Sequence, residues 1–450
     1  MTQEEKNPLA KNFNAASLIK FALPSMVMML FMGLYTTVDT FFVARFVGTN
    51  ALSSMNIVCP VIYVTVGLGT MLATGGSAIV AKKMGSGKAE EARKNFTLIV
   101  LTGALLGVTI TAIGLLFLDK IIWGLGASEL LFPYCRDYLT VQFLFAAFNI
   151  MQVLYQNLFV TAGKPTLGLA LAVLAGIANI VFDYIFIVLF DMGMKGASIG
   201  TGIGYLIPAV IGTIFFLTKK SELHFCRPQM DISVLAKSCS NGASEMINQC
   251  STAVTTFLFN AAMMKRLGED GVAAITVLIY SGFLLTTLFI GFSMGTAPII
   301  SYNYGSRNVK QLKKVIYLCF CFIAGISILV FVFSYFNGER ISRIFAENNT
   351  NVFEITKTGF RIYSYSFLFS GCNILASALF TACSNGKASA VISFLRTLGL
   401  ITFLLLVLPE FLGVTGVWLA IPIAELLTLT VTASFVVRHL SIFSKTDPPK

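Results

Sequence analysis

Acidic residues within apolar sequence are the side chains of this chain whose type and spacing could do chemistry. Asp39 lies in one long apolar run. Asn179 and Asp183 lie in a second run, and Thr201 lies in the run that follows. Asn179 and Asp183 are four residues apart, so they share one face of a helix. A charged side chain at the centre of a bilayer costs about 2.5–3.5 kcal/mol, so acids placed there mark candidate functional sites.

These four side chains support two kinds of chemistry. Their carboxylate, amide and hydroxyl oxygens could surround a small cation such as Na+, because hard cations prefer oxygen ligands. The two carboxylates could equally bind and release a proton as a coupled pair. A plainer interpretation is that Asp39 and Asp183 each end a span near the membrane surface, with Arg45 close to Asp39. Apart from Na+ at this place, we expect no metal and no cofactor.

A polar stripe follows one further apolar run at helical spacing. Polar side chains at this spacing either form hydrogen bonds between helices or line a water-filled cavity, and the sequence leaves both alternatives open. The stripe consists of Tyr138, Gln142, Asn149, Gln152 and Gln156.

The second half of the chain has its own charged residues in apolar sequence. Glu245 and Glu425 each lie well inside a run, and Arg361 lies near the outer end of another. A glutamate in such a place carries a proton, meets a cationic substrate, or is a structural partner of Arg361 or of a hydroxyl group. The sequence does not choose among these roles.

The elements that must position these residues are membrane-spanning helices. The chain is 56% hydrophobic and only 12% charged, and runs of about 20 apolar residues recur along it, each long enough to cross a bilayer. We predict an all-α membrane protein with about twelve transmembrane helices. The expected spans lie near residues 17–43, 52–81, 95–118, 137–162, 167–190, 197–218, 235–263, 272–302, 315–336, 358–383, 389–408 and 414–437.

The second half of the chain repeats the first at an offset of about 220 residues. Gly75 and Gly85, for example, match Gly295 and Gly305. Six spans per half is an even number, so we expect parallel repeats in the form of two pseudo-symmetric six-helix lobes. The predicted organisation is a cytoplasmic N-terminal segment at 1–16, an N-lobe at 17–218, a cytoplasmic linker at 219–234, a C-lobe at 235–437 and a cytoplasmic tail at 438–450.

The two halves differ at the candidate site. At the positions equivalent to these four polar residues, the second half has apolar residues or glycine. The site therefore belongs to one half only. The counterparts of Asp39, Asn179, Asp183 and Thr201 are Phe259, Gly399, Phe403 and Ile421.

The net charge of +11 follows the membrane topology. The basic residues concentrate in loops on one side, and the positive-inside rule therefore places both termini in the cytoplasm. This sorting accounts for the charge without a nucleic-acid partner. The nine cysteines have no disulfide or metal-ligand spacing and are interpreted as small apolar residues. The two histidines, both in predicted cytoplasmic segments, make no catalytic pattern, so a membrane-embedded enzyme is disfavoured.

Three segments resemble the motifs of a transporter family. Val38-Asp39-Thr40 is similar to a Val-Asp-Thr motif, Asn179 to Asp183 to an Asn-x-x-x-Asp motif, and Gly196 to Thr201 to the Gly-Ala segment that follows it. By these motifs the chain resembles the multidrug and toxic compound extrusion (MATE) family of the flippase-like superfamily, over nearly its whole length.

This resemblance implies an efflux antiporter driven by H+ or Na+. It implies that Asp39, Asn179, Asp183 and Thr201, with Tyr35 and Tyr138 nearby, form a cation site in the N-lobe. One branch of the family uses a pair of acids in the C-lobe for sodium, and Glu245 and Glu425 do not clearly fall on those positions.

We therefore expect a cation-coupled multidrug antiporter of the inner (plasma) membrane. It would export hydrophobic or cationic small molecules by alternating access, and we expect it to be a monomer in the lipid bilayer. The alternatives within the same superfamily are a flippase of lipid-linked precursors and an exporter of a narrow set of metabolites.

Overall fold

A computed structural model describes residues 7–218, 221–346 and 350–445, which are helical almost throughout and contain no strand. The first six residues, the last five, and Lys219 and Lys220 at the start of the predicted linker lie outside the described residues. After the short helix η2 (Pro8–Ala10), the N-lobe contains α1 (Ala15–Phe42), η3 (Val43–Val47), α2 (Thr49–Gly85), α3 (Ala89–Leu116), α4 (Leu118–Gly124), α5 (Phe132–Leu144), α6 (Ala146–Thr161), α7 (Pro165–Asp183), η4 (Tyr184–Leu189) and α8 (Gly193–Leu217).

The C-lobe follows the linker and starts with the longest helix of the described chain. Its elements are α9 (Ile232–Gly305), α10 (Val309–Ala346), α11 (Thr350–Tyr363), η5 (Ser364–Ser366), α12 (Phe367–Ala382), α13 (Gly386–Phe394), η6 (Leu395–Gly399), α14 (Leu400–Leu412) and α15 (Val414–Lys445).

The helices account for the predicted number of spans. Ten helices of the described residues are long and apolar enough to cross a membrane, and the pair α5 and α6, bent by 55°, makes an eleventh. At about 1.5 Å per residue, the 74 residues of α9 are far longer than the ~30 Å hydrocarbon core of a bilayer. Because Gly268 has non-helical backbone angles in its middle, α9 is two spans joined at a sharp turn. The all-α fold with two six-span lobes is confirmed.

Glycine is required at the turns that the two lobes share. Gly48 (φ 112°) separates η3 from α2, and its counterpart Gly268 (φ 62°) divides α9. Gly193 (φ 53°) is the first residue of α8, and its counterpart Gly413 (φ 59°) directly precedes α15. A side chain with a Cβ atom is strained at such φ values. The repeat therefore retains glycine where the chain must turn between spans.

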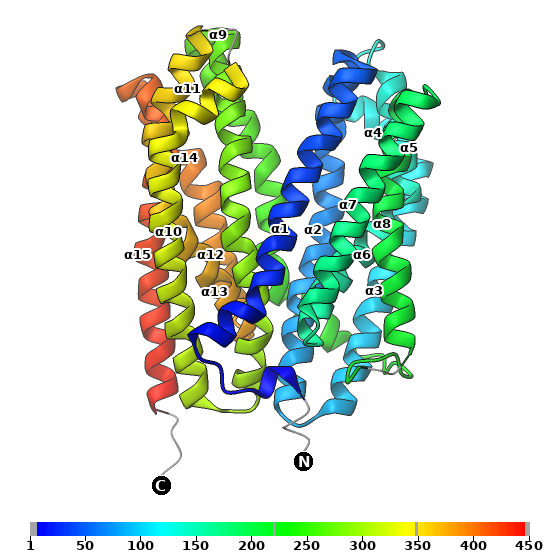
Figure 1. Cartoon of the computed structure of the whole chain (residues 1–450), viewed down its shortest axis with the longest axis vertical. Helices are drawn as coiled ribbons and strands as arrows, with labels where there is room; N and C mark the ends of the chain where they lie inside the picture. Colours follow the sequence, from blue (N-terminus) through cyan, green and yellow to red (C-terminus); the bar gives the residue numbers. More distant parts are fainter. Residues whose placement is uncertain (1–6, 219–220, 347–349, 446–450) are drawn as a thin grey trace.

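The two lobes form a V (Figure 1). They lie close together at the end of the molecule that carries η2 and the last turns of α15, and they diverge toward the opposite end, where α11 lies. Helices α1 and α2 of the N-lobe pack along α9 of the C-lobe. These crossings hold the lobes together at the narrow end of the V, which we call the terminal end.

Reciprocal glycine contacts join the lobes at the terminal end. The backbone of Gly85 lies directly against the carbonyl oxygen of Tyr302, and the backbone of Gly305 lies against that of Lys82. The two contacts are related by the repeat offset. The Ser86 hydroxyl also donates a hydrogen bond of 3.1 Å to the carbonyl oxygen of Gly305. A Cβ atom on either glycine would collide with the opposite backbone, so both lobes need glycine here.

Candidate functional site

The N-lobe site is centred on two carboxyl groups from different helices. Asp39 of α1 is 8% exposed, and Asp183 of α7 is fully buried. Their side chains are close enough to interact with each other, and Asn179, one turn before Asp183 and only 2% exposed, adjoins Asp183. The structure thus brings together the two aspartates that lie about 140 residues apart in sequence.

Helix α8 closes the site through glycine. A Cβ atom on Gly200 would collide with Oδ1 of Asp183, and one on Gly204 would lie 3.5 Å from Cβ of Asn179. The two glycines are four residues apart, so they form one smooth face on which α7 packs. Thr201 follows Gly200, but its hydroxyl donates to the carbonyl oxygen of Ala197 at 3.0 Å, within its own helix. The Thr201 hydroxyl therefore donates within α8 and not to either aspartate.

Several buried polar atoms of the site have no hydrogen-bond partner within the described residues. They are Oδ1 of Asp39, both carboxylate oxygens of Asp183, and both amide atoms of Asn179. Burying an ionised carboxylate without compensation is costly, and a buried acid therefore takes up a proton or binds a cation. The oxygen-rich donor set fits a proton or Na+, since hard cations bind oxygen ligands.

The helices that carry the aspartates widen next to them. The π-helical segment η3 begins four residues after Asp39, and η4 begins directly after Asp183. At the end of η3, the N–H of Gly48 donates to the carbonyl oxygen of Val43, five residues back, at 3.0 Å. Such π-helical turns inside α-helices are frequent at functional sites, because they shift the register of the side chains that follow.

Three tyrosines surround the carboxyl groups. Tyr35 lies next to Asp39 and Gln152, and Tyr138 lies within electrostatic range of both aspartates. Tyr205 of α8 lies within range of Asp39 and Tyr35. Tyr205 was not among the predicted site residues. The available signal was its register, because Tyr205 is the counterpart of Glu425 in the other half.

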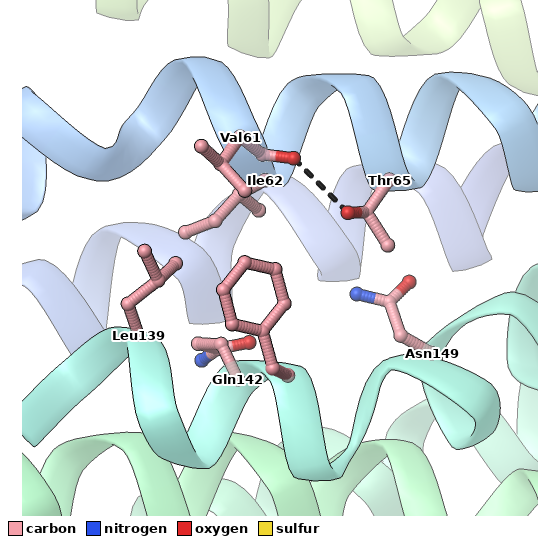
Figure 2. Close-up of a pocket in the computed structure, with 7 residues that line it drawn as sticks. Val61, Ile62, Thr65, Leu139, Gln142 and Asn149 are labelled. Carbon is pink, nitrogen blue, oxygen red and sulfur yellow. Dashed lines mark hydrogen bonds between the residues drawn. The ribbon is translucent and has the colours of Figure 1, made fainter. Parts of the chain in front are cut away.

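The polar stripe is divided between two helices. The chain bends by 55° between α5 and α6, so Tyr138 and Gln142 lie before the bend and the other three residues lie after it. Gln142 and Asn149 line a small cavity together with Thr65 of α2, and Asn149 lies opposite Thr65 (Figure 2). The cavity has room for about one water molecule.

The stripe residues have two kinds of surroundings, a water-sized cavity and a contact between helices. Nε2 of Gln142 is buried without a partner among the described residues, which suits a bound water. Gln156 instead contacts α1, with its Nε2 atom 3.4 Å from the sulfur of Met32. Gln152 is 3% exposed and adjoins Tyr35, and its Oε1 atom also has no hydrogen-bond partner among the described residues.

The C-lobe holds a different buried cluster. Nε of Arg396 donates to Oε1 of Glu425 at 2.9 Å. Nδ2 of Asn373 donates to Oε2 of Glu425 at 2.7 Å, and Thr432 donates to Oδ1 of Asn373 at 2.9 Å. The side chains of Arg396 and Glu425 are 15% and 6% exposed. Helices α12 and α15 and the π-helical segment η6 are thereby joined around one glutamate.

This pairing corrects one alternative of the sequence analysis. Arg361, which we considered as the partner of Glu425, is exposed near the end of α11 and lines a separate cavity with Glu339 and Lys357. The partner is Arg396, which was not among the predicted site residues. Its signal was available, because Arg396 is the lone charged residue in the predicted span 389–408.

Glu245 belongs to the same region of the C-lobe. It is half-buried on α9, with Oε2 3.5 Å from Nδ2 of Asn248 and within electrostatic range of Arg396. Two glutamates therefore share the neighbourhood of one guanidinium group. With both glutamates ionised, this cluster has one negative charge in excess.

A sequence model of the MatE family matches residues 24–185 and 246–408, one copy in each lobe. The chain belongs to the MatE family. The multidrug export protein MepA of Staphylococcus saprophyticus subsp. saprophyticus is 22% identical over 444 residues, which are 98% of this chain and 97% of that protein. The resemblance to MATE transporters that the sequence motifs indicated is confirmed.

Solved structures of MATE proteins share the fold. A crystal structure of MATE in complex with MaL6 superposes with a TM-score of 0.92 at 21% identity, over 98% of both chains. The outward-facing conformation of a multidrug resistance MATE family transporter of the MOP superfamily gives a TM-score of 0.91 at 21% identity, also over 98% of both chains. This MatE protein is therefore a multi-pass membrane transporter with two repeated lobes.

Proposed function

We propose that this MatE transporter is a cation-coupled efflux antiporter for hydrophobic or cationic small molecules. The single observation that carries the proposal is the pair of neighbouring carboxyl groups, Asp39 and Asp183, whose buried oxygens lack partners among the described residues. H+ or Na+ would bind there, with Asn179 as a further ligand. Thr201, Tyr35 and Tyr138 would support the site, and so would Tyr205.

Helix α1 offers a direct route from this site to the lobe interface. It carries Asp39, and it also packs on α9 of the C-lobe, where Gly291 lies against Met26 and Gly295 lies against Ala22. Binding of a cation at Asp39 changes the charge on α1 and so changes the balance between arrangements of the two lobes. A cation drives exchange only if it binds the two arrangements with unequal affinity.

The arrangement of the lobes supports an outward-facing state. By the positive-inside rule the terminal end would lie in the cytoplasm, and at this end the Gly85 and Gly305 contacts close the molecule. The V then opens to the outside, as in the outward-facing MATE transporter that superposes with a TM-score of 0.91. This topology would belong to a protein of the plasma membrane with both termini inside, and we expect it to work as a monomer.

The C-lobe cluster supports cationic substrates. Glu245 and Glu425 share one Arg396, so a positively charged substrate group would balance the remaining charge. The export proteins to which the chain is similar are described as multidrug exporters. Hydrophobic cations are the substrate class that matches both observations.

Ethidium efflux from proteoliposomes tests the proposal. Purified wild type, Asp39→Asn and the control Asp119→Asn are compared under an imposed pH gradient and an imposed sodium gradient. Asp119 is an exposed acid paired with Arg136, so its variant controls for the loss of one negative charge. We expect efflux that follows one gradient in wild type and the control and is absent in Asp39→Asn. Unchanged efflux in Asp39→Asn, or movement of fluorescent lipid without ethidium, would contradict the proposal.

A further inference from the structure

The described residues contain a second hollow, which lies in the C-lobe. It lies between α10 and α11 at the wide end of the V, where α11 is labelled in Figure 1. Its volume is about 270 Å³. The residues that line it combine aromatic and charged side chains, namely Tyr335, Phe336, Gly338, Glu339, Lys357 and Arg361.

Positive charge predominates in and around this hollow. Glu339 is shared by two cations, with Nζ of Lys357 at 3.1 Å and Nη2 of Arg343 at 3.4 Å. Arg361 is exposed, and none of the described residues gives its guanidinium group an acidic partner. One carboxylate therefore faces three basic side chains, and Arg361 has its donors free for a ligand.

The equivalent place in the N-lobe is electrically balanced. There Nε of Arg136 lies 3.0 Å from Oδ1 of Asp119, and Nζ of Lys195 lies 3.2 Å from Oδ1 of Asp137. Each of these two basic residues has one acid, and both pairs are ordinary surface ion pairs, which contribute little to stability.

Comparison of equivalent positions in the two lobes shows which residues give the C-lobe hollow its excess positive charge. Glu339 keeps the charge of its counterpart Asp119. Lys357, in contrast, replaces Asp137, and Arg361 replaces Val141. An acid has become a base and an apolar residue has become an arginine, at two positions one helical turn apart that line the same hollow. Neither basic residue is needed for the fold, because the N-lobe has the same fold with Asp137 and Val141 at these positions.

An apolar surface leads away from the hollow along α10. Phe336 both lines the hollow and is 73% exposed. Exposed apolar side chains continue from it at helical spacing toward the middle of the span, so they lie on one face, which in a membrane faces lipid. They are Ile328, Leu329, Val332 and Phe333.

We propose that this hollow binds the anionic headgroup of a phospholipid in the leaflet at the wide end of the V. A guanidinium group and an ammonium group bind the phosphate oxygens, since arginine offers paired donors that match them. The aromatic side chains Tyr335 and Phe336 lie at the level of the membrane interface, where such residues are enriched. The acyl chains follow the apolar face of α10. A free phosphate ion shares the headgroup chemistry but not the apolar contact.

Native mass spectrometry of the full-length protein in detergent tests the site. Wild type is titrated with dioleoyl phosphatidylglycerol and, separately, with dioleoyl phosphatidylcholine and inorganic phosphate. The main variant is Lys357→Asp/Arg361→Val, which installs the residues of the N-lobe. The control is Arg136→Ala/Lys195→Ala, which removes two exposed basic residues from the same end of the other lobe.

We expect wild type and the control to retain phosphatidylglycerol in preference to phosphatidylcholine. Affinity of the main variant should fall at least about tenfold, because each basic residue near a lipid headgroup contributes substantially. Arg361→Gln gives a smaller loss in the same direction and serves as a second variant, since Arg361 is exposed and its change does not disturb packing. Equal retention by wild type and the main variant overturns the proposal. Binding of inorganic phosphate with no preference between the two lipids also overturns it.

Discussion

Arg396 and Glu425 are joined by a hydrogen bond of 2.9 Å inside the C-lobe. The equivalent positions of the N-lobe hold Gly176 and Tyr205, so this ion pair belongs to one lobe only. The two N-lobe aspartates likewise have phenylalanine at the equivalent positions of the C-lobe. Each lobe has therefore placed its buried charges at different positions of the same repeated fold.

Breaking the C-lobe pair should destabilise the protein strongly. Arg396→Met leaves Glu425 buried with one hydrogen-bonding side chain fewer, and removal of one member of a buried ion pair costs about 3–5 kcal/mol. The double variant Arg396→Met/Glu425→Met should be closer to wild type than Arg396→Met alone. Thermal unfolding in detergent measures both effects. Lys195→Met, which breaks an exposed pair with Asp137, is the control and should cost at most about 1 kcal/mol. Additive losses in the double variant would contradict the coupling.

The coupling ion should stabilise the folded protein through the N-lobe site. A ligand present at 100 times its dissociation constant adds about 2.7 kcal/mol to the free energy of unfolding. If the ion is Na+, the melting temperature of wild type should rise when NaCl replaces choline chloride at constant ionic strength. Asp39→Asn should show no such rise, because it removes a carboxylate of the site. A rise of equal size in that variant would place the sodium elsewhere.

Replacing one glycine at the terminal end by alanine should separate the two lobes there. A Cβ atom on Gly85 collides with the carbonyl oxygen of Tyr302, so Gly85→Ala favours arrangements in which this contact is broken. Cys383 is 2% exposed and lies next to Lys82 of the other lobe. We expect maleimide to label Cys383 several-fold faster in Gly85→Ala, as measured by peptide mass spectrometry.

The matched control for this experiment is Gly325→Ala. Gly325 lies on an exposed face of α10, and a Cβ atom there meets nothing within 4 Å. Alanine in place of glycine inside an exposed helix stabilises it by up to about 1 kcal/mol. Because the added methyl group touches neither lobe contact, labelling of Cys383 should remain at the wild-type rate in this control. The same rate in Gly85→Ala would show that the glycine contact does not hold the lobes together.

The fold was predictable from the sequence because the bilayer fixes the length of an apolar helix. The number of spans and the two lobes follow from that constraint and from the repeat. The boundaries were less accurate where helices bend or continue. The fourth span starts at Phe132 and bends near Phe145, and the seventh and eighth spans form α9 with only Gly268 between them. Bends depend on packing against neighbouring helices, which apolar runs do not encode.

The candidate site was predictable to a similar degree. Asp39 and Asp183 were selected because acids in apolar sequence are costly, and the structure places them side by side. The partner of Glu425 and the place of Tyr205 depend on which helix faces meet, and no local pattern reports that. The roles of the site residues and the domain boundaries stay predictions.

Two glycines of α8 give the sharpest test of the N-lobe site. A Cβ atom on Gly200 collides with Oδ1 of Asp183, whereas one on Gly204 makes only contacts of 3.4 and 3.5 Å, with Ala175 and Asn179. Both variants to alanine keep the helix, because alanine favours helix more than glycine does. We expect Gly200→Ala to displace the Asp183 carboxylate and to abolish gradient-driven ethidium efflux.

Gly204→Ala should leave that efflux within about twofold of wild type, since contacts near 3.5 Å are at ordinary van der Waals distance. Melting temperatures of the two variants confirm that each is folded. Equal efflux in the two variants would mean that the position of the Asp183 carboxylate does not control coupling. A loss in Gly200→Ala alone, with a normal melting temperature, would locate the coupling function at Asp183, because the two changes differ only in which atoms the added methyl group meets.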